Sequence, residues 1–308
     1  MVAKIALPIA ALLCVLSVAV SRSPADEPAT AETSADAAQS EEKYLLRYKF
    51  TPGEVVRWNV EHKARVRTTV QGSTQTADTT SISVKRWQIE DVAEDGSVSY
   101  VHWVDRVDMR QQLTGREAQR YNSETDSQAP VGYEDVAKAV GVPLTAITID
   151  AQGNVKRREE KHPQPGAGNG PVTIPLPAEA VPAGHTWTRE HDLHVRLADG
   201  SVKTIQTRQQ FRLKKVENGV ATIGVATQFL TPVRDPQIQV QLIQHDTSGT
   251  VRFDIDAGRV VWQQTELDKR VVGFSGQSSS MHYVTRFTEK LLADTGPTAA
   301  RPERDAKK

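Results

Sequence analysis

The residues best suited to chemistry in this sequence are three nearby histidines, His185, His191 and His194, with Glu190 and Asp192 between them. Imidazole nitrogens and carboxylate oxygens are common ligands of transition metals. The surrounding alternation predicts a strand, on which an odd step of three places His191 and His194 on opposite faces. His185 and His191 share a face, but their Cα atoms would lie about 20 Å apart at about 3.3 Å per residue. We therefore expect solvent-facing polar residues, with no metal ligands and no cofactor.

Two Glu-His pairs, Glu61-His62 and Glu190-His191, offer a second route to chemistry, and each histidine lies four residues after a tryptophan. A histidine beside a carboxylate can act as a general base. By parity, however, His62 shares its face with Trp58, which favours a partly buried residue that hydrogen-bonds within the sheet. We assign no catalytic residue, and an enzyme that uses His62 or His191 with neighbouring carboxylates stays open as an alternative.

Motif and charge analysis excludes several classes of function. The sequence contains no nucleophile elbow, phosphate loop, dinucleotide fingerprint, zincin helix or cysteine-based metal site. Its 308 residues carry 38 Lys+Arg against 38 Asp+Glu, and the basic tract 156–158 is followed at once by two glutamates. Without clustered positive charge we expect no nucleic-acid partner. An apolar ligand or a protein of the cell envelope remains open as a partner, and no ligand-binding residue can be named.

The N-terminal residues predict export. Residues 1–21 hold Lys4 and then the apolar run Ile5–Val20, which is typical of a cleaved secretory signal. We expect an extracytoplasmic protein, periplasmic or secreted, with no membrane span after cleavage. Cys14, the single cysteine, lies inside this run behind two leucines, so a lipoprotein is the less favoured alternative; an uncut anchor is another. If Cys14 leaves with the signal, the mature chain can form no disulfide.

Composition divides the rest of the chain. Segments rich in Ala, Ser, Thr, Pro and charge, without aromatic residues or periodicity, cannot bury enough surface to fold. A stretch rich in Pro and Gly predicts a linker between two folded halves. The expected order is a disordered leader at 22–42, a first β unit at 43–160, a linker at 161–182, a second β unit at 183–292 and a disordered tail at 293–308.

Alternation with a period of two dominates the two β units. It is clearest at 56–70, where apolar residues on one face oppose charged residues on the other, as in a half-buried antiparallel strand. After Val84 the apolar phase slips, which indicates a bulge near Lys85-Arg86. One helix is predicted at 133–140, stopped by a glycine and a proline. Further strands are expected around Leu46/Tyr48/Phe50, Ile82/Val84, Leu193/Val195/Leu197, Ile238/Val240/Leu242, Val251/Phe253/Ile255 and Met281/Tyr283/Phe287.

Tight turns separate these strands. Asp150, Asp254 and Asp256 flank two of the turns, and we expect them to cap backbone N–H groups rather than bind calcium. The turn signals are Gln71-Gly72, Asp95-Gly96, Gln152-Gly153, Asp199-Gly200, Asn218-Gly219 and Ala257-Gly258.

Three marks recur in the same order in both halves, which indicates an old duplication. Each half has a Gly–Trp–Glu-His strand entry, a tight turn and a late hairpin with the pattern Ile/Phe-x-Ile-Asp-Ala. The paired marks are 53–62 and 184–191, 95–98 and 218–220, and 147–155 and 253–260.

A Gly-x-x-Trp entry, a Gly-Val turn and the Phe-Asp-x-Asp-x-Gly-Arg-Val hairpin at 253–260 resemble a family of uncharacterised exported bacterial proteins. The resemblance covers most of 44–290. It implies a signal-bearing, β-rich extracytoplasmic protein, and it brings no catalytic residue because no activity is established for that family.

The fold class follows from these elements. We predict a mainly β protein of two related curved antiparallel sheet units, packed as a sandwich or open barrel, with one short helix. The aromatic residues should form its core, although some could instead line an apolar groove. A non-enzymatic binding or envelope-associated module is favoured; a cell-envelope enzyme and a carrier of lipid or lipidated protein are the alternatives. The aromatic set is Trp58, Trp87, Trp103, Trp187, Trp262, Phe211, Phe229, Phe253 and Phe287.

Overall fold

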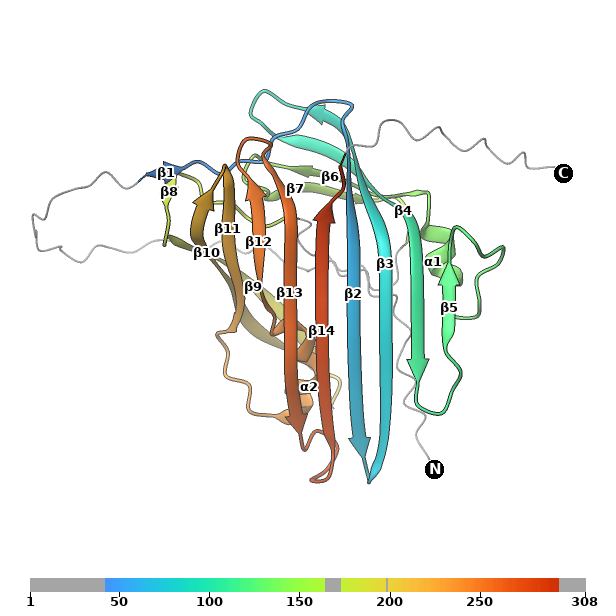
Figure 1. Cartoon of the computed structure of the whole chain (residues 1–308). Coiled ribbons are helices and arrows are strands. Elements are labelled where there is room, and N and C mark those ends of the chain that lie inside the picture. Colours follow the sequence, from blue (N-terminus) through green and yellow to red (C-terminus); the bar gives the residue numbers. More distant parts are fainter. Residues whose placement is uncertain (1–41, 164–172, 198, 294–308) are drawn as a thin grey trace, which may run out of the picture.

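The computed structural model describes residues 42–163, 173–197 and 199–293 (Figure 1). The predicted signal, nearly all of the predicted leader and tail, and residues 164–172 of the predicted linker lie outside the described residues.

A single antiparallel sheet of 12 strands forms the body of the protein, in the order β7-β6-β4-β3-β2-β14-β13-β12-β11-β10-β9, with β5 beside β4. β7 and β9 are edge strands, so this sheet is open, and Figure 1 shows it curving away behind its central strands. The prediction of a mainly β, antiparallel, open curved fold is confirmed. The strands are β1 (Lys43–Tyr44), β2 (Val55–Val70), β3 (Ser73–Val92), β4 (Val98–Leu113), β5 (Gln119–Asn122), β6 (Pro143–Ile149), β7 (Val155–Glu160), β8 (Val181–Pro182), β9 (Thr186–Arg196), β10 (Val202–Glu217), β11 (Val220–Phe229), β12 (Ser248–Asp254), β13 (Arg259–Val272) and β14 (Ser280–Leu291).

The two halves of the chain follow the same path through this sheet. β2, β3, β4, β6 and β7 form one meander, β9 to β13 form the other, and β14 lies between β13 and β2. Trp58 and Trp187 stand near the starts of the equivalent strands β2 and β9. The repeated turns join β3 to β4 and β10 to β11, and the repeated hairpins join β6 to β7 and β12 to β13. All three repeated sequence marks therefore fall at equivalent places.

Both repeated hairpins hold the same N-terminal segment, residues 44–50. The amide of Tyr48 donates to the carbonyl of Ala151 in one hairpin (2.8 Å). The amide of Lys49 donates to the carbonyl of Gly258 in the other hairpin (3.0 Å). The carboxylate of Asp150 accepts from two backbone amides of its turn, as predicted. These bonds tie the two halves together across the N-terminal segment.

The largest core cluster is aromatic and fills one end of the sheet, under the segments 44–50 and 174–181. Trp87 stacks on Tyr100 with ring centroids 4.2 Å apart and lies 4.8 Å from Trp58. We call the side of the sheet that carries this cluster the inner face. Two tryptophans expected in the core, Trp103 and Trp262, instead lie on the outer face.

Arginines explain the position of these two tryptophans. Arg86 lies 4.3 Å from the ring centroid of Trp103, and Arg252 lies 5.6 Å from that of Trp262. A cation over an indole ring stabilises the ring outside the core.

The bulge predicted near Lys85-Arg86 lies on the neighbouring strand instead: Val84 pairs with Arg106 and Lys85 with Val104, which leaves Asp105 of β4 as the extra residue. β3 itself pairs with β2 without interruption, and the apolar phase slips because its apolar residues change from the outer to the inner face.

The predicted helix is α1 (Glu134–Ala139). The strand predicted around Leu46, Tyr48 and Phe50 is wrong, because β1 ends at Tyr44 and the segment that follows is irregular. The strand predicted around Ile238, Val240 and Leu242 is also wrong, because that segment is the helix α2 (Pro236–Leu242), followed by a 3-10 turn η1 (Ile243–His245).

Local signals account for α2. Asp235 caps the helix by accepting from the amide of Gln237 (2.8 Å), and Pro236 occupies its first turn. Ile238 and Leu242, four residues apart, are buried on one face of the helix.

The described end of the predicted linker packs against the core. Leu176 is buried, and its amide donates to the carbonyl of Gln152 (2.8 Å). The Nε1 of Trp187 donates to the carbonyl of Pro175 (2.7 Å). Residues 173–182 thus connect the β6–β7 hairpin to the second meander.

Candidate functional site

The inner face is only partly filled by the aromatic core. One register row crosses seven strands from β3 to β10 and meets that core only at its β10 end, where Phe211 belongs to the cluster and Val225 packs against it. The row mixes small residues with a histidine and two phenylalanines, and five of its seven members remain half-buried, so this part of the inner face keeps accessible surface. The row is Ser81, His62, Phe287, Thr265, Gly249, Val225 and Phe211, of which His62 and Phe211 are buried and the other five half-buried.

A buried ion pair lies between this row and the aromatic core. Lys85 forms an ion pair with Glu289, whose side chain is only 5% exposed. The Nε2 of Gln263 donates to the second oxygen of Glu289 (2.7 Å). The Nζ of Lys85 also lies 4.6 Å from the ring centroid of Trp58 and 5.1 Å from that of Trp87. The charges are therefore compensated within the protein.

Other polar groups of the inner face are buried without compensation. Four buried side-chain atoms of this face have no hydrogen-bond partner within the part of the chain that the structure describes: the hydroxyl of Tyr100, Nε2 of His102, Nη1 of Arg189 and Nδ1 of His191. An unpaired buried donor or acceptor costs about 1–3 kcal/mol. Such groups mark places where a bound molecule could supply the missing partner.

Burial keeps the inner histidines neutral. It lowers the pKa of His102 to about 3, and the positive charges of Lys85 and Arg158 act in the same direction. Burial also lowers the pKa of His62, His191 and His245. His62 accordingly acts as a neutral partner of Thr285, with Nε2 and Oγ1 2.8 Å apart.

A pH dependence of stability follows from His102. The pKa is about 3 in the folded chain and near 6.5 when unfolded, so the unfolded chain binds more protons between these values. The contribution of neutral His102 to the free energy of unfolding is therefore fully present above about pH 6.5. It is lost as the pH falls toward 3, by roughly 5 kcal/mol in total. In urea unfolding from pH 7 to 4, the free energy of unfolding of H102F should fall less steeply with pH than that of the wild type. The difference in slope should be about 1.4 kcal/mol per pH unit. Equal slopes in the two proteins would contradict this.

The structure keeps His185, His191 and His194 apart, and the prediction that they face solvent is wrong for His191. His191 is buried on the inner face, whereas His194 is exposed on the outer face, as the parity of the strand predicts. His185 is exposed and stacks on Trp187 with centroids 6.3 Å apart. Among the described residues no group of three or more His, Cys, Asp or Glu is arranged to hold a metal ion.

The Glu-His pairs are also divided between the two faces. Glu61 lies on the outer face and forms an ion pair with Lys63 at 2.7 Å, while His62 points inward. Glu190 is exposed and His191 is buried. Consecutive residues of a strand point to opposite faces, so neither histidine can use the carboxylate beside it.

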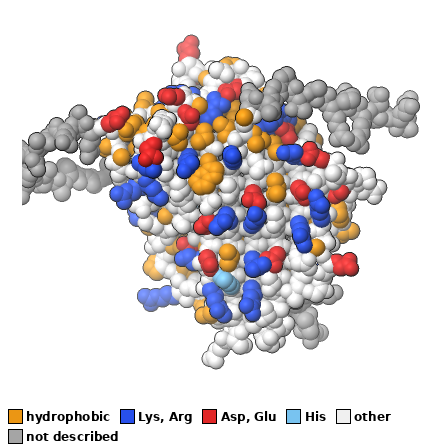
Figure 2. Space-filling model, viewed as in Figure 1, with side chains coloured by type: hydrophobic (Ala, Val, Ile, Leu, Met, Phe, Trp, Pro, Cys, Tyr) orange, Lys and Arg blue, Asp and Glu red, His pale blue; other side chains and the backbone are white. Residues whose placement is uncertain are grey.

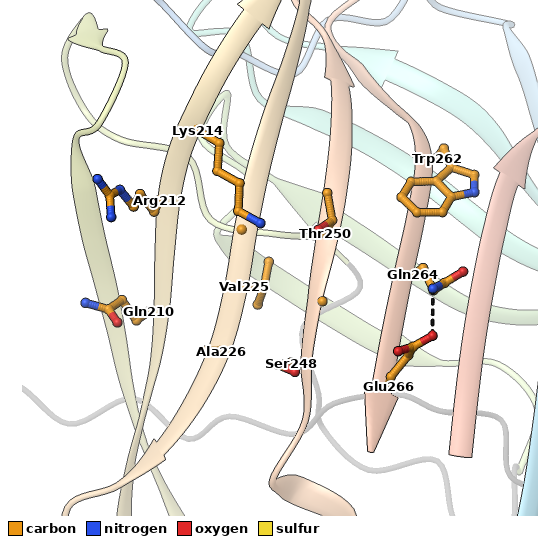
Figure 3. Close-up of a pocket in the computed structure, with 12 residues that line it drawn as sticks. Gln210, Arg212, Lys214, Val225, Ala226, Ser248, Thr250, Trp262, Gln264 and Glu266 are labelled. Carbon is orange, nitrogen blue, oxygen red and sulfur yellow. Dashed lines mark hydrogen bonds between the residues drawn. The ribbon is translucent and has the colours of Figure 1, made fainter. Parts of the chain in front are cut away.

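The outer face carries a trough that the sequence analysis missed (Figure 3). Its volume is about 460 Å³. Small residues on β11 and β12 form the floor, and long side chains on β10 and β13 form the walls. The two register rows that cross it are Arg212–Gly224–Thr250–Gln264 and Gln210–Ala226–Ser248–Glu266.

Elsewhere on the outer face, charges of both signs are interspersed, as Figure 2 shows. Arg57 and Arg86 both contact Asp105, at 3.1 and 2.7 Å. Arg286 pairs with Glu266 at 2.8 Å, and His282 lies 2.7 Å from Asp268.

Within the described ranges, no helix is long and apolar enough to cross a membrane.

Comparison with protein-family models and with curated proteins finds no match. Comparison with solved structures matches lipovitellin, from a study of its lipid–protein interactions, at 12% identity and TM-score 0.45, covering 82% of this chain and 26% of that chain. This chain therefore spans about a quarter of the lipovitellin chain. DynF from the dynemicin biosynthesis pathway of Micromonospora chersina matches at 6% identity and TM-score 0.21, covering 86% and 92%. A DUF1329 family protein from Desulfovibrio piger matches at 12% identity and TM-score 0.14, covering 78% and 87%.

Proposed function

We propose that this chain is a non-enzymatic, extracytoplasmic binding protein that holds an amphipathic ligand on the inner face of its open sheet. The observation that carries this proposal is the half-buried row on that face, which lies beside buried polar atoms without partners. Export rests on the signal-like residues 1–21, and membership of the uncharacterised exported family rests on the motifs at 253–260 and elsewhere.

The chemistry of the inner face fits a ligand with an apolar body and an anionic head. Phe287 supplies half-buried apolar surface in the row, and Val225 continues it where the row meets the core. Arg189 lies one register row further, beside Gln209, and its Nη1 is buried with no hydrogen-bond partner among the described residues. A carboxylate or phosphate at the head of the ligand would give this guanidinium a charge-assisted hydrogen bond.

The enzyme alternative has less support. It requires a histidine with a neighbouring carboxylate, and Glu61 and Glu190 lie on the face opposite their histidines. The alternative of a lipid carrier is compatible with the inner face, because a fatty acyl chain with an acidic head has the required chemistry.

Binding of dansyl-labelled undecanoic acid tests this proposal. We expect the fluorescence of the probe to rise with the wild-type protein, and T265W to weaken its binding at least about tenfold, because the indole would fill the centre of the row. The matched control is T288W, since Thr288 lies on the outer face of the adjacent strand β14. T288W should bind like the wild type. No binding by the wild type, or equal losses in the two variants, would refute the inner-face site.

A substitution at the head-group position separates specific from general apolar binding. R189M should weaken binding of the dansyl acid and leave binding of its uncharged methyl ester unchanged. Equal affinities of R189M and wild type for the acid would exclude Arg189 as the partner of the head group.

A further inference from the structure

The outer trough has the construction of a second binding site. In each register row that crosses it, the residues on β11 and β12 are small, and those on β10 and β13 are long. The flanking strands lie about 14 Å apart, which is three spacings of about 4.8 Å. The trough therefore runs along the strands, and its volume of about 460 Å³ lies within the usual range of ligand sites.

Gly224 keeps the floor of the trough low. A Cβ at this position would lie 2.6 Å from Cε of Lys214, whose chain passes over the glycine (Figure 3). A side chain at this position would force the end of Lys214 to move. The absence of a side chain thus places the ammonium group of Lys214 directly in the site.

The wall formed by β10 is cationic. Arg212 and Lys214 are exposed, and neither makes an ion pair with any residue in the described ranges. Arg208 continues the same face of β10 and is held by the side-chain oxygen of Gln228 at 2.9 Å, an uncharged partner. The one carboxylate that lines the trough, Glu266, is already neutralised by Arg286. The site therefore favours an anionic ligand.

The opposite wall supplies aromatic and amide groups. Trp262 stands on β13 above Gln264, whose Nε2 donates to Glu266 at 2.8 Å (Figure 3). Ser248 and Thr250 add hydroxyl groups on the floor. An indole ring suits the flat face of a pyranose, and amides and hydroxyls suit its hydroxyl groups.

The sheet itself argues against a peptide strand as the occupant. The strands β10 to β13 are each paired on both sides along the trough, so their backbone groups are already bonded. An added peptide strand needs a free sheet edge, and this site offers only side chains. We propose that the trough binds an acidic polysaccharide, with uronic-acid carboxylates on Arg212 and Lys214 and a sugar ring on Trp262.

Isothermal titration with hexagalacturonate at low ionic strength tests this assignment. Wild-type protein should bind it, whereas R212Q/K214Q should bind at least about a hundredfold more weakly, because two charge-assisted hydrogen bonds are lost. W262L should also weaken binding. The matched control K63Q/R65Q removes two cations from the outer face of β2, away from the trough, and should leave the affinity within about twofold.

Two other ligands decide the class of the occupant. Uncharged maltohexaose should bind much more weakly than hexagalacturonate. Equal binding of the two would show that Arg212 and Lys214 do not recognise the carboxylates. Hexaglutamate should fail to compete, and equal competition would overturn the assignment to a glycan in favour of acidic peptides. No binding of hexagalacturonate by the wild type would overturn the proposal outright.

This site is independent of the inner face. R212Q/K214Q should keep its affinity for dansyl-undecanoic acid, so failure of the outer trough and failure of the inner-face site give different results. Thermal unfolding of each variant checks that the loss of binding does not come from loss of folding.

Discussion

Replacing Glu289 by glutamine is expected to lower the free energy of unfolding by about 3–5 kcal/mol, as removal of one partner of a buried ion pair does. The side chains of Lys85 and Glu289 are 17% and 5% exposed. In E289Q, the ammonium group of Lys85 would stay between Trp58 and Trp87 without a counter-charge. Urea unfolding followed by tryptophan fluorescence measures the change directly, since both indoles contact the pair.

An exposed pair provides the control for this prediction. Glu266 pairs with Arg286 at 2.8 Å, with side chains 48% and 61% exposed, so E266Q should cost less than about 1 kcal/mol. The double variant K85M/E289L removes both buried charges and should recover most of the stability lost in E289Q. A cost in E289Q no larger than that in E266Q, or no recovery in the double variant, would contradict the buried pair.

Replacing Gly153 by alanine should cost about 3 kcal/mol or more. Gly153 has a φ of +84°, and a Cβ there would overlap Cε2 of Tyr48 and lie 2.8 Å from the carbonyl oxygen of Ile174. The left-handed conformation costs a residue with a Cβ about 1–2 kcal/mol. Overpacking against a fixed backbone adds about 1–3 kcal/mol. The midpoint of thermal unfolding should fall accordingly.

A comparison with Gly72 separates the cost of the backbone conformation from the cost of steric overlap. Its φ of +77° is similar, but a Cβ there would have no atom within 4 Å. G72A should therefore show only the cost of the backbone conformation, about 1–2 kcal/mol. If G153A and G72A lost the same stability, the contacts of Gly153 with Tyr48 and Ile174 would contribute nothing.

The sequence predicts those features of the fold that depend on neighbouring residues. Alternation located most strands, and turn dipeptides located the hairpins. The phase slip after Val84 was read as a bulge in β3, but β3 pairs regularly with β2 and the extra residue is Asp105 of β4. α2 was missed because Ile238, Val240 and Leu242 also fit a period of two, and only the capping by Asp235 identifies the helix. Trp103 and Trp262 were placed in the core because aromatic residues usually lie there, whereas arginines hold them outside.

The candidate sites depend on relations that a single sequence does not contain. Parity correctly predicted that His191 and His194 lie on opposite faces. The inner row and the outer trough, by contrast, each require the register of several strands that are distant in the chain. Gly224 and Gln264 are 40 positions apart and line the same hollow only because β11, β12 and β13 pair as they do.

The position of β14 has a consequence for how the chain folds. This strand comes last among the described strands, yet it pairs with β2 and joins the two meanders in the middle of the sheet. Each meander can pair its own strands locally, but β2 and β13 keep unpaired edges until residues 280–291 are in place. Completion of the sheet therefore waits for contacts of very long sequence separation, which are slow to form. Until then the two exposed edges are open to pairing with other chains, so the last strand also acts as the protection of this protein against aggregation.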